Sequence, residues 1–301
     1  MASIFVQISA YEDHELHKTI IDCIEKSSGK NEIHFGINVV FNNYDIFIPS
    51  VPNLKIKKSK APLNLGVGIG RYIANEFYDG QDFYLQVDAH TRFAERWDEL
   101  AIDSYNLYKQ QGCNPVLTAY PSAYWYEDGK EVFDPSPDTN AIDFRIEDID
   151  LFKRTKFFHQ YSKYTEGSIF TKSVSGGSIF SSGSISSIAP NKKMFNWGEE
   201  MLYAARLFTH GYDLMIPQKQ YLFHLYYNHE KPESNFRTIS GNDFPDEVNK
   251  IVAQSDQEIY SIITENIISD QGFGTTRTLD EYWFYIGLDD SLVSIAKHSN
   301  L

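Results

Sequence analysis

The sequence contains few cysteines: among its 301 residues only Cys23 and Cys113 occur. Two cysteines do not build the disulfide framework of a small secreted domain, so we expect reduced thiols and a cytoplasmic location. The sequence also lacks an apolar run as long as a membrane span. Residues 1–3 lead directly into a predicted strand, so we expect neither a signal peptide nor a membrane span.

Positive charge is scarce as well. Lys and Arg number 27 against 41 Asp and Glu, which gives a formal net charge of −14. Such a surface repels a phosphate backbone, so the charge argues against nucleic acid as a partner. A small phosphate compound remains a possible ligand wherever a metal ion or a local arginine supplies positive charge.

The first part of the chain alternates between strand and helix patterns. Residues 3–10 are rich in β-branched and aromatic side chains and predict a strand, 15–26 have helical spacing, and 31–41 predict a second strand. This order predicts an α/β protein with a parallel sheet. The first strand-to-helix loop has no glycine-rich fingerprint, so neither a dinucleotide-binding fold nor a P-loop is indicated.

Further elements follow along the chain. Residues 127–150 are polar and predict a long loop, of the kind that often serves as a substrate lid. The other predicted elements are a strand at 54–60, a helix within 65–80, a buried strand from 83, a helix at 97–111, a strand at 115–120, a helix that ends at His210, strands at 214–216 and 221–227, and a helix around 248–266.

The buried strand that begins at Phe83 ends in Asp88-Ala89-His90. Alternate residues of a strand point to the same side, so the Asp88 carboxylate and the His90 imidazole face one point at the carboxyl end of the sheet. This pair suits Mn²⁺, or Zn²⁺ with more nitrogen or sulfur ligands. The alternative is that Asp88 caps a turn and His90 lies on the surface. His224, in a later apolar strand, is either a core residue or a third ligand.

Arg71 follows three alternate glycines, Gly66, Gly68 and Gly70, at the start of a predicted helix. A cation is poorly placed there for the helix dipole, which indicates an anionic partner such as a phosphate or Asp88. A solvated surface arginine is the alternative.

Two more sets of residues are candidates for binding. Gly176-Gly177 would let a ligand approach the backbone closely, although a plain tight turn fits equally well. Trp197 precedes Glu199 and Glu200, a combination that favours a sugar-facing site, whereas the helix dipole alone also explains the two acids.

The loop after the first strand holds two further candidates. Tyr11 could stack on a base and Asp13 could accept hydrogen bonds from one, while helix capping by Asp13 is the alternative.

Taken together, several segments resemble the metal-dependent GT-A glycosyltransferases related to the Skp1-type polypeptide α-N-acetylglucosaminyltransferases, and more distantly the mucin-type polypeptide N-acetylgalactosaminyltransferases. The resemblance runs over nearly the whole chain. It implies a mixed, mostly parallel central sheet flanked by helices, with a catalytic domain at 1–235 and a C-terminal extension at 236–301 packed on it. The segments that carry the resemblance are 85–93, 197–200, 204–213, 224–226 and 272–279.

The resemblance also implies roles for the candidate residues. Asp88, His90 and His224 would hold Mn²⁺ (or Mg²⁺) against the phosphates of a UDP-sugar. Glu199 and Glu200 would be the catalytic candidates, as ligands of sugar or acceptor or, in a double displacement, as nucleophile. The residues implied in holding the donor are Ser9, Tyr11, Asp13, Arg71, Gly176, Gly177 and Trp197.

The implied reaction is a retaining transfer of GlcNAc from UDP-GlcNAc to a hydroxyl of a polypeptide acceptor, on Ser, Thr or hydroxyproline. The same fold could extend a glycan acceptor with another UDP-hexose. Two other classes stay open: a non-catalytic sugar-nucleotide-binding module, and a metal-dependent hydrolase of nucleotide sugars.

Overall fold

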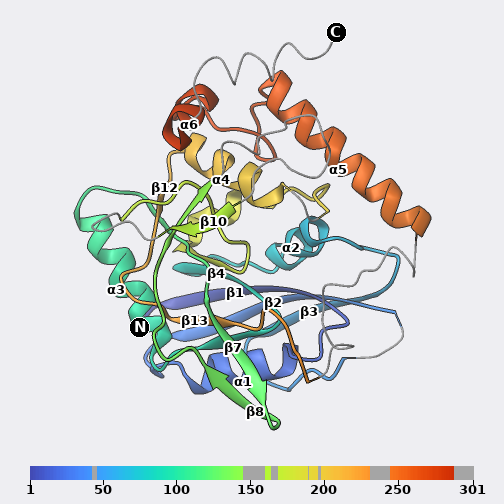
Figure 1. Ribbon diagram of the computed structural model, residues 1–301, viewed down its shortest axis with the longest axis vertical. Helices are drawn as coiled ribbons and strands as arrows, with labels where there is room; N and C mark the ends of the chain where they lie inside the picture. The colour runs from blue at the N-terminus through green and yellow to red at the C-terminus, as the bar shows by residue number, and fades with distance from the viewer. Residues whose placement is uncertain are drawn as a thin grey trace.

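A seven-stranded sheet forms the centre of the molecule (Figure 1). The computed structural model describes residues 1–42, 46–144, 160–163, 169–188, 190–195, 198–230 and 245–287. The strand order is β12-β6-β11-β4-β1-β2-β3. β11 runs antiparallel to β4 and β6, and the other pairs in this sheet are parallel. The prediction of a mixed, mostly parallel sheet is therefore confirmed.

Most strands agree with those predicted from the sequence, but β11 was not predicted. Those of the central sheet are β1 (Ser3–Tyr11), β2 (Glu32–Phe41), β3 (Leu54–Lys60), β4 (Phe83–Asp88), β6 (Pro115–Leu117), β11 (Ser178–Ser182) and β12 (Asp213–Met215).

Helices cover both faces of this sheet (Figure 1). α1 (Leu16–Glu25) and α3 (Trp97–Gln110) pack on one face, where they bury Ile4, Val6 and Ile8 of β1. α2 (Val67–Asn75) and α4 (Glu199–Thr209) lie over the other face. Helices on both faces explain why strands of this sheet are apolar along most of their length.

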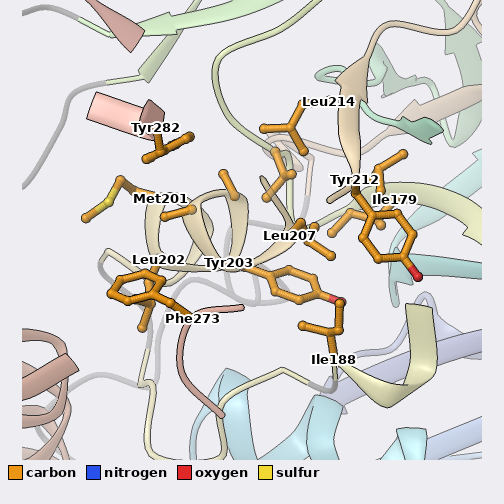
Figure 2. Close-up of a cluster of buried hydrophobic side chains, with 14 of the residues drawn as sticks. Ile179, Ile188, Met201, Leu202, Tyr203, Leu207, Tyr212, Leu214, Phe273 and Tyr282 are labelled. Atoms are coloured by element: carbon orange, nitrogen blue, oxygen red, sulfur yellow. The ribbon is translucent and has the colours of Figure 1, made fainter. Parts of the chain in front are cut away.

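α4 is the centre of the second core. Figure 2 shows its apolar side chains, among them Met201, Leu202 and Leu207, surrounded by the side chains of Leu214, Phe273 and neighbouring residues. Part of this shell comes from the C-terminal region, where α5 (Pro245–Glu265) and α6 (Leu279–Ile286) contribute buried residues. The described residues after 244 therefore share a core with α4, and the domain boundary at 235/236 stays a prediction.

A four-stranded sheet, in the order β5-β13-β7-β8, lies beside the carboxyl end of β4. Its strands are β5 (Thr91–Phe93), β7 (Ser122–Glu127), β8 (Lys130–Phe133) and β13 (Leu222–His224). A two-stranded sheet joins β9 (Ala141–Phe144) and β10 (Gln160–Lys163).

The loop predicted for 127–150 is wrong over its first part, because β8 and β9 occupy it. Asp128 and Gly129 both have positive φ and turn β7 tightly into β8, as two-residue hairpins require. Several acids in this stretch concealed the strand pattern, although Glu131 binds the buried Arg92 and Asp143 is itself buried. Residues 145–150 lie outside the described part of the chain.

A polar row crosses the sheet beneath α2. Ser9 of β1 is paired in register with Asn38 of β2 and with Asp88 of β4, and two residues earlier Gln7 is paired with Gln86. Because alternate residues share a face, all five side chains lie on the face toward α2. An otherwise apolar sheet is thus polar where it approaches the carboxyl end of β4.

No helix among the described residues has both the length and the hydrophobicity that a membrane crossing requires.

Candidate active site

The break between β4 and β5 places two ligand-type side chains at the edge of the sheet. Asp88 is the last residue of β4, and His90 follows it in the turn to Thr91, whose hydroxyl donates to the Asp88 carbonyl over 2.9 Å. His224 ends β13, which pairs with β5 opposite Thr91. A backbone hydrogen bond of 3.1 Å from Leu225 to the His90 carbonyl ties β13 to this turn.

Asp88, His90 and His224 form one group of ligands. One donor atom from each lies within 4.8 Å of the others. The Nε2 atoms of His90 and His224 are 2.9 Å apart, and Nε2 of His224 is 3.3 Å from Oδ2 of Asp88. The structure thus brings together the three predicted metal ligands. One carboxylate and two imidazoles form a donor set that fits Mn²⁺ better than Mg²⁺, which prefers oxygen alone.

Arg71 is buried, with 5% of its surface exposed, and binds two carboxylates. Its Nη2 donates to Oδ1 of Asp88 over 3.1 Å, and its Nη1 donates to Oε1 of Glu199 over 2.5 Å. Of the alternatives for Arg71, a solvated surface position is wrong, and Asp88 is an anionic partner as predicted. The two nitrogen donors of the guanidinium thus link α2, which carries Arg71, to β4 and α4.

The charge on Asp88 is stabilised by these neighbours. Burial would raise the pKa of Asp88, but the hydrogen bond from His224 and the positive charge of Arg71 outweigh burial and hold this pKa well below its usual range. Burial lowers the pKa of His224, and the neighbouring His90 lowers it further. The group therefore keeps an ionised carboxylate beside a neutral imidazole, the forms in which both bind metals.

The glycine pair closes over the same group. A Cβ on Gly177 would lie 2.5 Å from Oδ2 of Asp88, and a Cβ on Gly176 would lie 2.6 Å from Nη1 of Arg71. The backbone here is held on both sides, because the Gly176 N–H donates to Oε1 of Glu200 over 2.6 Å and its carbonyl accepts from Nε2 of Gln86 over 2.7 Å. Glycine is required here because side chains of the protein itself approach this backbone closely, whereas the predicted approach of a ligand stays a prediction.

Glu199 and Glu200 are adjacent in sequence but differ in environment. Glu199 accepts a hydrogen bond from Arg71, whereas Glu200 accepts one from the Gly176 N–H. Burial and the nearby negative charge of Glu199 raise the pKa of Glu200 to about 7. Glu200 is therefore about half protonated near neutral pH and can both donate and accept hydrogen bonds.

The loop after β1 supplies a residue with two contacts. Oδ2 of Asp13 accepts from Nδ1 of His90 over 2.7 Å, and its Oδ1 accepts the N–H of Glu15 over 2.9 Å. Asp13 thus accepts a backbone N–H in the turn before α1, but the N-cap residue of this helix is Glu15, whose side chain makes no capping hydrogen bond, so the capping alternative for Asp13 is not confirmed. The second oxygen of Asp13 has a partner that was not predicted. Tyr11, at the end of β1, packs against a small apolar cluster that includes Val40.

Other residues of the site are absent from the sequence-based candidates. The ring of Tyr226 lies against His224, with ring centroids 4.4 Å apart, and its hydroxyl donates to the Pro121 carbonyl over 2.7 Å. Gln86 was also missed, although an amide in the middle of an apolar strand is a signal that could have indicated it. Trp197 lies outside the described residues.

Comparison with known protein families gives a match over most of the chain. A family model described as glycosyltransferase (GlcNAc) matches residues 49–292. No curated protein matches the chain in sequence.

A solved structure shares the architecture. The structure of GalNAc-T7 with UDP, GalNAc and Mn²⁺ superposes with a TM-score of 0.54 at 12% identity, over 98% of this chain and 56% of that one. Staphylococcus aureus TarS residues 1–349 give a TM-score of 0.41 at 13% identity, over 84% and 65%. The same TarS segment in complex with UDP gives 0.42 at 12% identity, over 87% and 70%. The fold is GT-A, and the chain spans just over half the length of GalNAc-T7.

Proposed function

The chain belongs to the GlcNAc glycosyltransferase family, and we propose that it transfers GlcNAc from UDP-GlcNAc to a hydroxyl of a polypeptide, on Ser, Thr or hydroxyproline, with metal dependence and retention at the anomeric carbon. The observation that carries this proposal is the convergence of Asp88, His90 and His224 at the carboxyl end of β4. In open α/β sheets this end is where ligands bind.

We propose that these three residues hold Mn²⁺. A bound divalent cation supplies Lewis acidity that neutralises charge on the departing diphosphate. Asp88 provides the anionic ligand, and its low pKa keeps it ionised at every physiological pH. The GalNAc-T7 structure contains UDP and Mn²⁺, which supports the assignment by fold likeness only.

Arg71 positions the anionic ligand in this proposal. Its two hydrogen bonds restrain Asp88 from one side and Glu199 from the other. Glu199 is a poor nucleophile in this proposal, because its Oε1 accepts a hydrogen bond from Arg71 and the guanidinium stabilises its negative charge. We therefore assign Glu199 to the support of Arg71.

Glu200 is the better candidate for contact with the donor sugar or the acceptor. A carboxyl group with a pKa of about 7 is protonated too often to be an efficient nucleophile at neutral pH, but it hydrogen-bonds sugar hydroxyls in either form. This favours a front-face route. The acceptor oxygen bonds to the anomeric carbon as the bond from that carbon to UDP breaks, and the hydroxyl proton passes to the leaving phosphate oxygen.

The nucleotide would lie along the end of β1. Ser9 and Tyr11 remain our candidates for uridine, together with the neighbouring turn, because β1 adjoins β4 in the sheet. Trp197, two residues before Glu199 in the sequence, remains a candidate for the donor sugar.

The first test is thermal stability against a panel of UDP-sugars with and without Mn²⁺. A ligand at a hundred times its dissociation constant stabilises the folded state by about 2.7 kcal/mol, a readily measured shift. We expect UDP-GlcNAc to stabilise the wild type when Mn²⁺ is present, and to lose this effect in Asp88→Ala and His224→Ala. If a different UDP-hexose stabilises the protein instead, that compound takes the place of UDP-GlcNAc as the proposed donor. If no nucleotide sugar shifts the unfolding transition, the proposed donor and metal site is refuted.

The second test concerns the acceptor. Release of UDP is measured with and without Ser-, Thr- and hydroxyproline-containing peptides, and glycans serve as the comparison. We expect peptides to raise turnover. Turnover that water alone supports and no acceptor raises would indicate a hydrolase, and donor binding without any turnover would indicate a binding module.

A further inference from the structure

Asp13 joins the turn before α1 to one of the metal ligands. Its carboxylate is 2% exposed, and His90 is 6% exposed. Oδ2 of Asp13 accepts from Nδ1 of His90 over 2.7 Å, while Nε2 of His90 faces His224. We infer that Asp13 is a positioning residue that fixes the tautomer and the orientation of His90 for metal binding, an inference that rests on the proposed metal site.

The chemistry of the two side chains determines which nitrogen carries the proton. A carboxylate only accepts hydrogen bonds, so the nitrogen that faces Asp13 must be the protonated one. Nδ1 of the neutral imidazole therefore keeps its hydrogen and Nε2 keeps its lone pair. The lone pair is then on the side of Asp88 and His224, where a cation would be held.

The position of Asp13 is itself fixed by α1. Its Oδ1 accepts the N–H of Glu15 in the turn that begins the helix. One turn further on, the hydroxyl of Thr19 lies 2.7 Å from the Ala89 carbonyl and 2.9 Å from the Thr91 carbonyl, and accepts the Thr91 N–H over 3.1 Å. The first part of α1 is thus hydrogen-bonded to the residues on either side of His90, and Asp13 in the turn before α1 is hydrogen-bonded to His90 itself.

This arrangement gives Asp13 a different role from a nucleotide contact. Both of its oxygens already have partners inside the protein, one on the backbone and one on a metal ligand. Carboxylates that accept a hydrogen bond from a metal-binding imidazole raise its basicity and restrict its rotation, and their loss typically weakens metal binding about 10- to 100-fold. The turn after β1 and the metal site therefore act as one unit.

The experiment measures Mn²⁺ affinity of the whole chain without nucleotide, by calorimetry or by the Mn²⁺ electron paramagnetic resonance signal. Asp13→Asn keeps the size of the side chain, but its amide can donate to Nδ1 and so permits the wrong tautomer. We expect binding to weaken about 10- to 100-fold. Because no nucleotide is present, a contact with uridine cannot produce this result, and unchanged affinity would overturn the inference.

The matched control is Asp98→Asn, another buried carboxylate. Asp98 accepts from the N–H and the hydroxyl of Ser28 and from Nδ2 of Asn31, over 2.6 to 2.8 Å, and lies on α3 away from the three ligands. Its substitution should cost stability without changing Mn²⁺ affinity. Equal losses of affinity in both variants would mean that general destabilisation, and not Asp13, controls the metal site.

A second readout needs no substitution and no metal. The ¹⁵N signals of His90 in the metal-free wild type report the tautomer directly. We expect a hydrogen on Nδ1 and none on Nε2, and the opposite assignment would overturn the inference. If the wild type binds no Mn²⁺, the proposed function fails, but this spectrum still tests the role of Asp13.

Discussion

Glu200 makes the stability of the protein depend on pH in a direction opposite to that of most acids. Its pKa in the folded protein is about 7, against 4.5 for an unperturbed glutamate, because burial and Glu199 disfavour its charge. A raised pKa means that the folded state binds the proton more tightly than the unfolded state. The contribution to stability is therefore fully present below about pH 4.5 and is lost as the pH rises through about 7.

The size of the effect follows from the two pKa values. One unit of pKa difference corresponds to about 1.4 kcal/mol, so the shift amounts to about 3 kcal/mol in total, and about 2 kcal/mol of it is lost between about pH 5.5 and about pH 8. Glu200→Gln removes the titration and keeps an oxygen that accepts the Gly176 N–H. The free energy of unfolding of the variant, relative to that of the wild type, should rise by about 2 kcal/mol between about pH 5.5 and about pH 8.

The assay is denaturant unfolding of both proteins at several pH values, with a chelator present. The difference between the two curves isolates Glu200, because all other groups are shared. Glu281→Gln is the matched control: the Thr278 backbone N–H donates to Glu281 and lowers its pKa, so this carboxylate stays ionised in both states across the range. Its difference curve should be flat. A flat curve for Glu200→Gln as well would refute the assignment of a raised pKa.

Three further substitutions test other parts of the structure. Arg71→Met leaves the partly buried carboxylates of Asp88 and Glu199 without their cation and should lower the free energy of unfolding by about 3 kcal/mol. Arg71→Lys keeps the charge and should lower it less. If denaturant unfolding gave wild type and Arg71→Met the same stability, the ion pairs would be contradicted. Gly177→Ala places a methyl group 2.5 Å from Oδ2 of Asp88 and should weaken Mn²⁺ binding with little loss of melting temperature. Unchanged Mn²⁺ affinity in calorimetry would mean that the backbone at Gly177 can move to accommodate the methyl group. Thr278→Ala removes the capping box of α6 and should cost about 1 kcal/mol in thermal unfolding without any effect on Mn²⁺ affinity.

Local patterns predicted much of this fold, because they depend on neighbours in the chain. The apolar run before Asp88 is a strand, as predicted. Asp88 and His90 lie in one group of ligands, but His90 stands in the turn after β4, so that turn and not the period of two of an extended chain places it there. The glycine pair is visible in the sequence, whereas the side chains that approach it come from distant residues. The hairpin at 122–133 was missed in part, because the polar residues 127–131 obscured the alternation; one of them, Glu131, faces the buried Arg92.

The two adjacent glutamates show where local reasoning ends. Successive residues of a helix point about 100° apart, so Glu199 and Glu200 at the start of α4 necessarily face different surroundings. Which of them meets Arg71 and which meets Gly176 depends on how α2 and α4 pack on the sheet. The raised pKa of Glu200 is a consequence of that packing.

The sequence by itself determined the α/β architecture and placed Asp88 and His90 directly after a buried strand, because local patterns decide both. Only the tertiary structure decided that His224 completes the ligand group, that Arg71 binds two carboxylates and that Asp13 supports His90. These contacts join residues separated by 134, 128 and 77 positions. No local pattern encodes such pairs, because they form only when the helices and both sheets pack around the carboxyl end of β4.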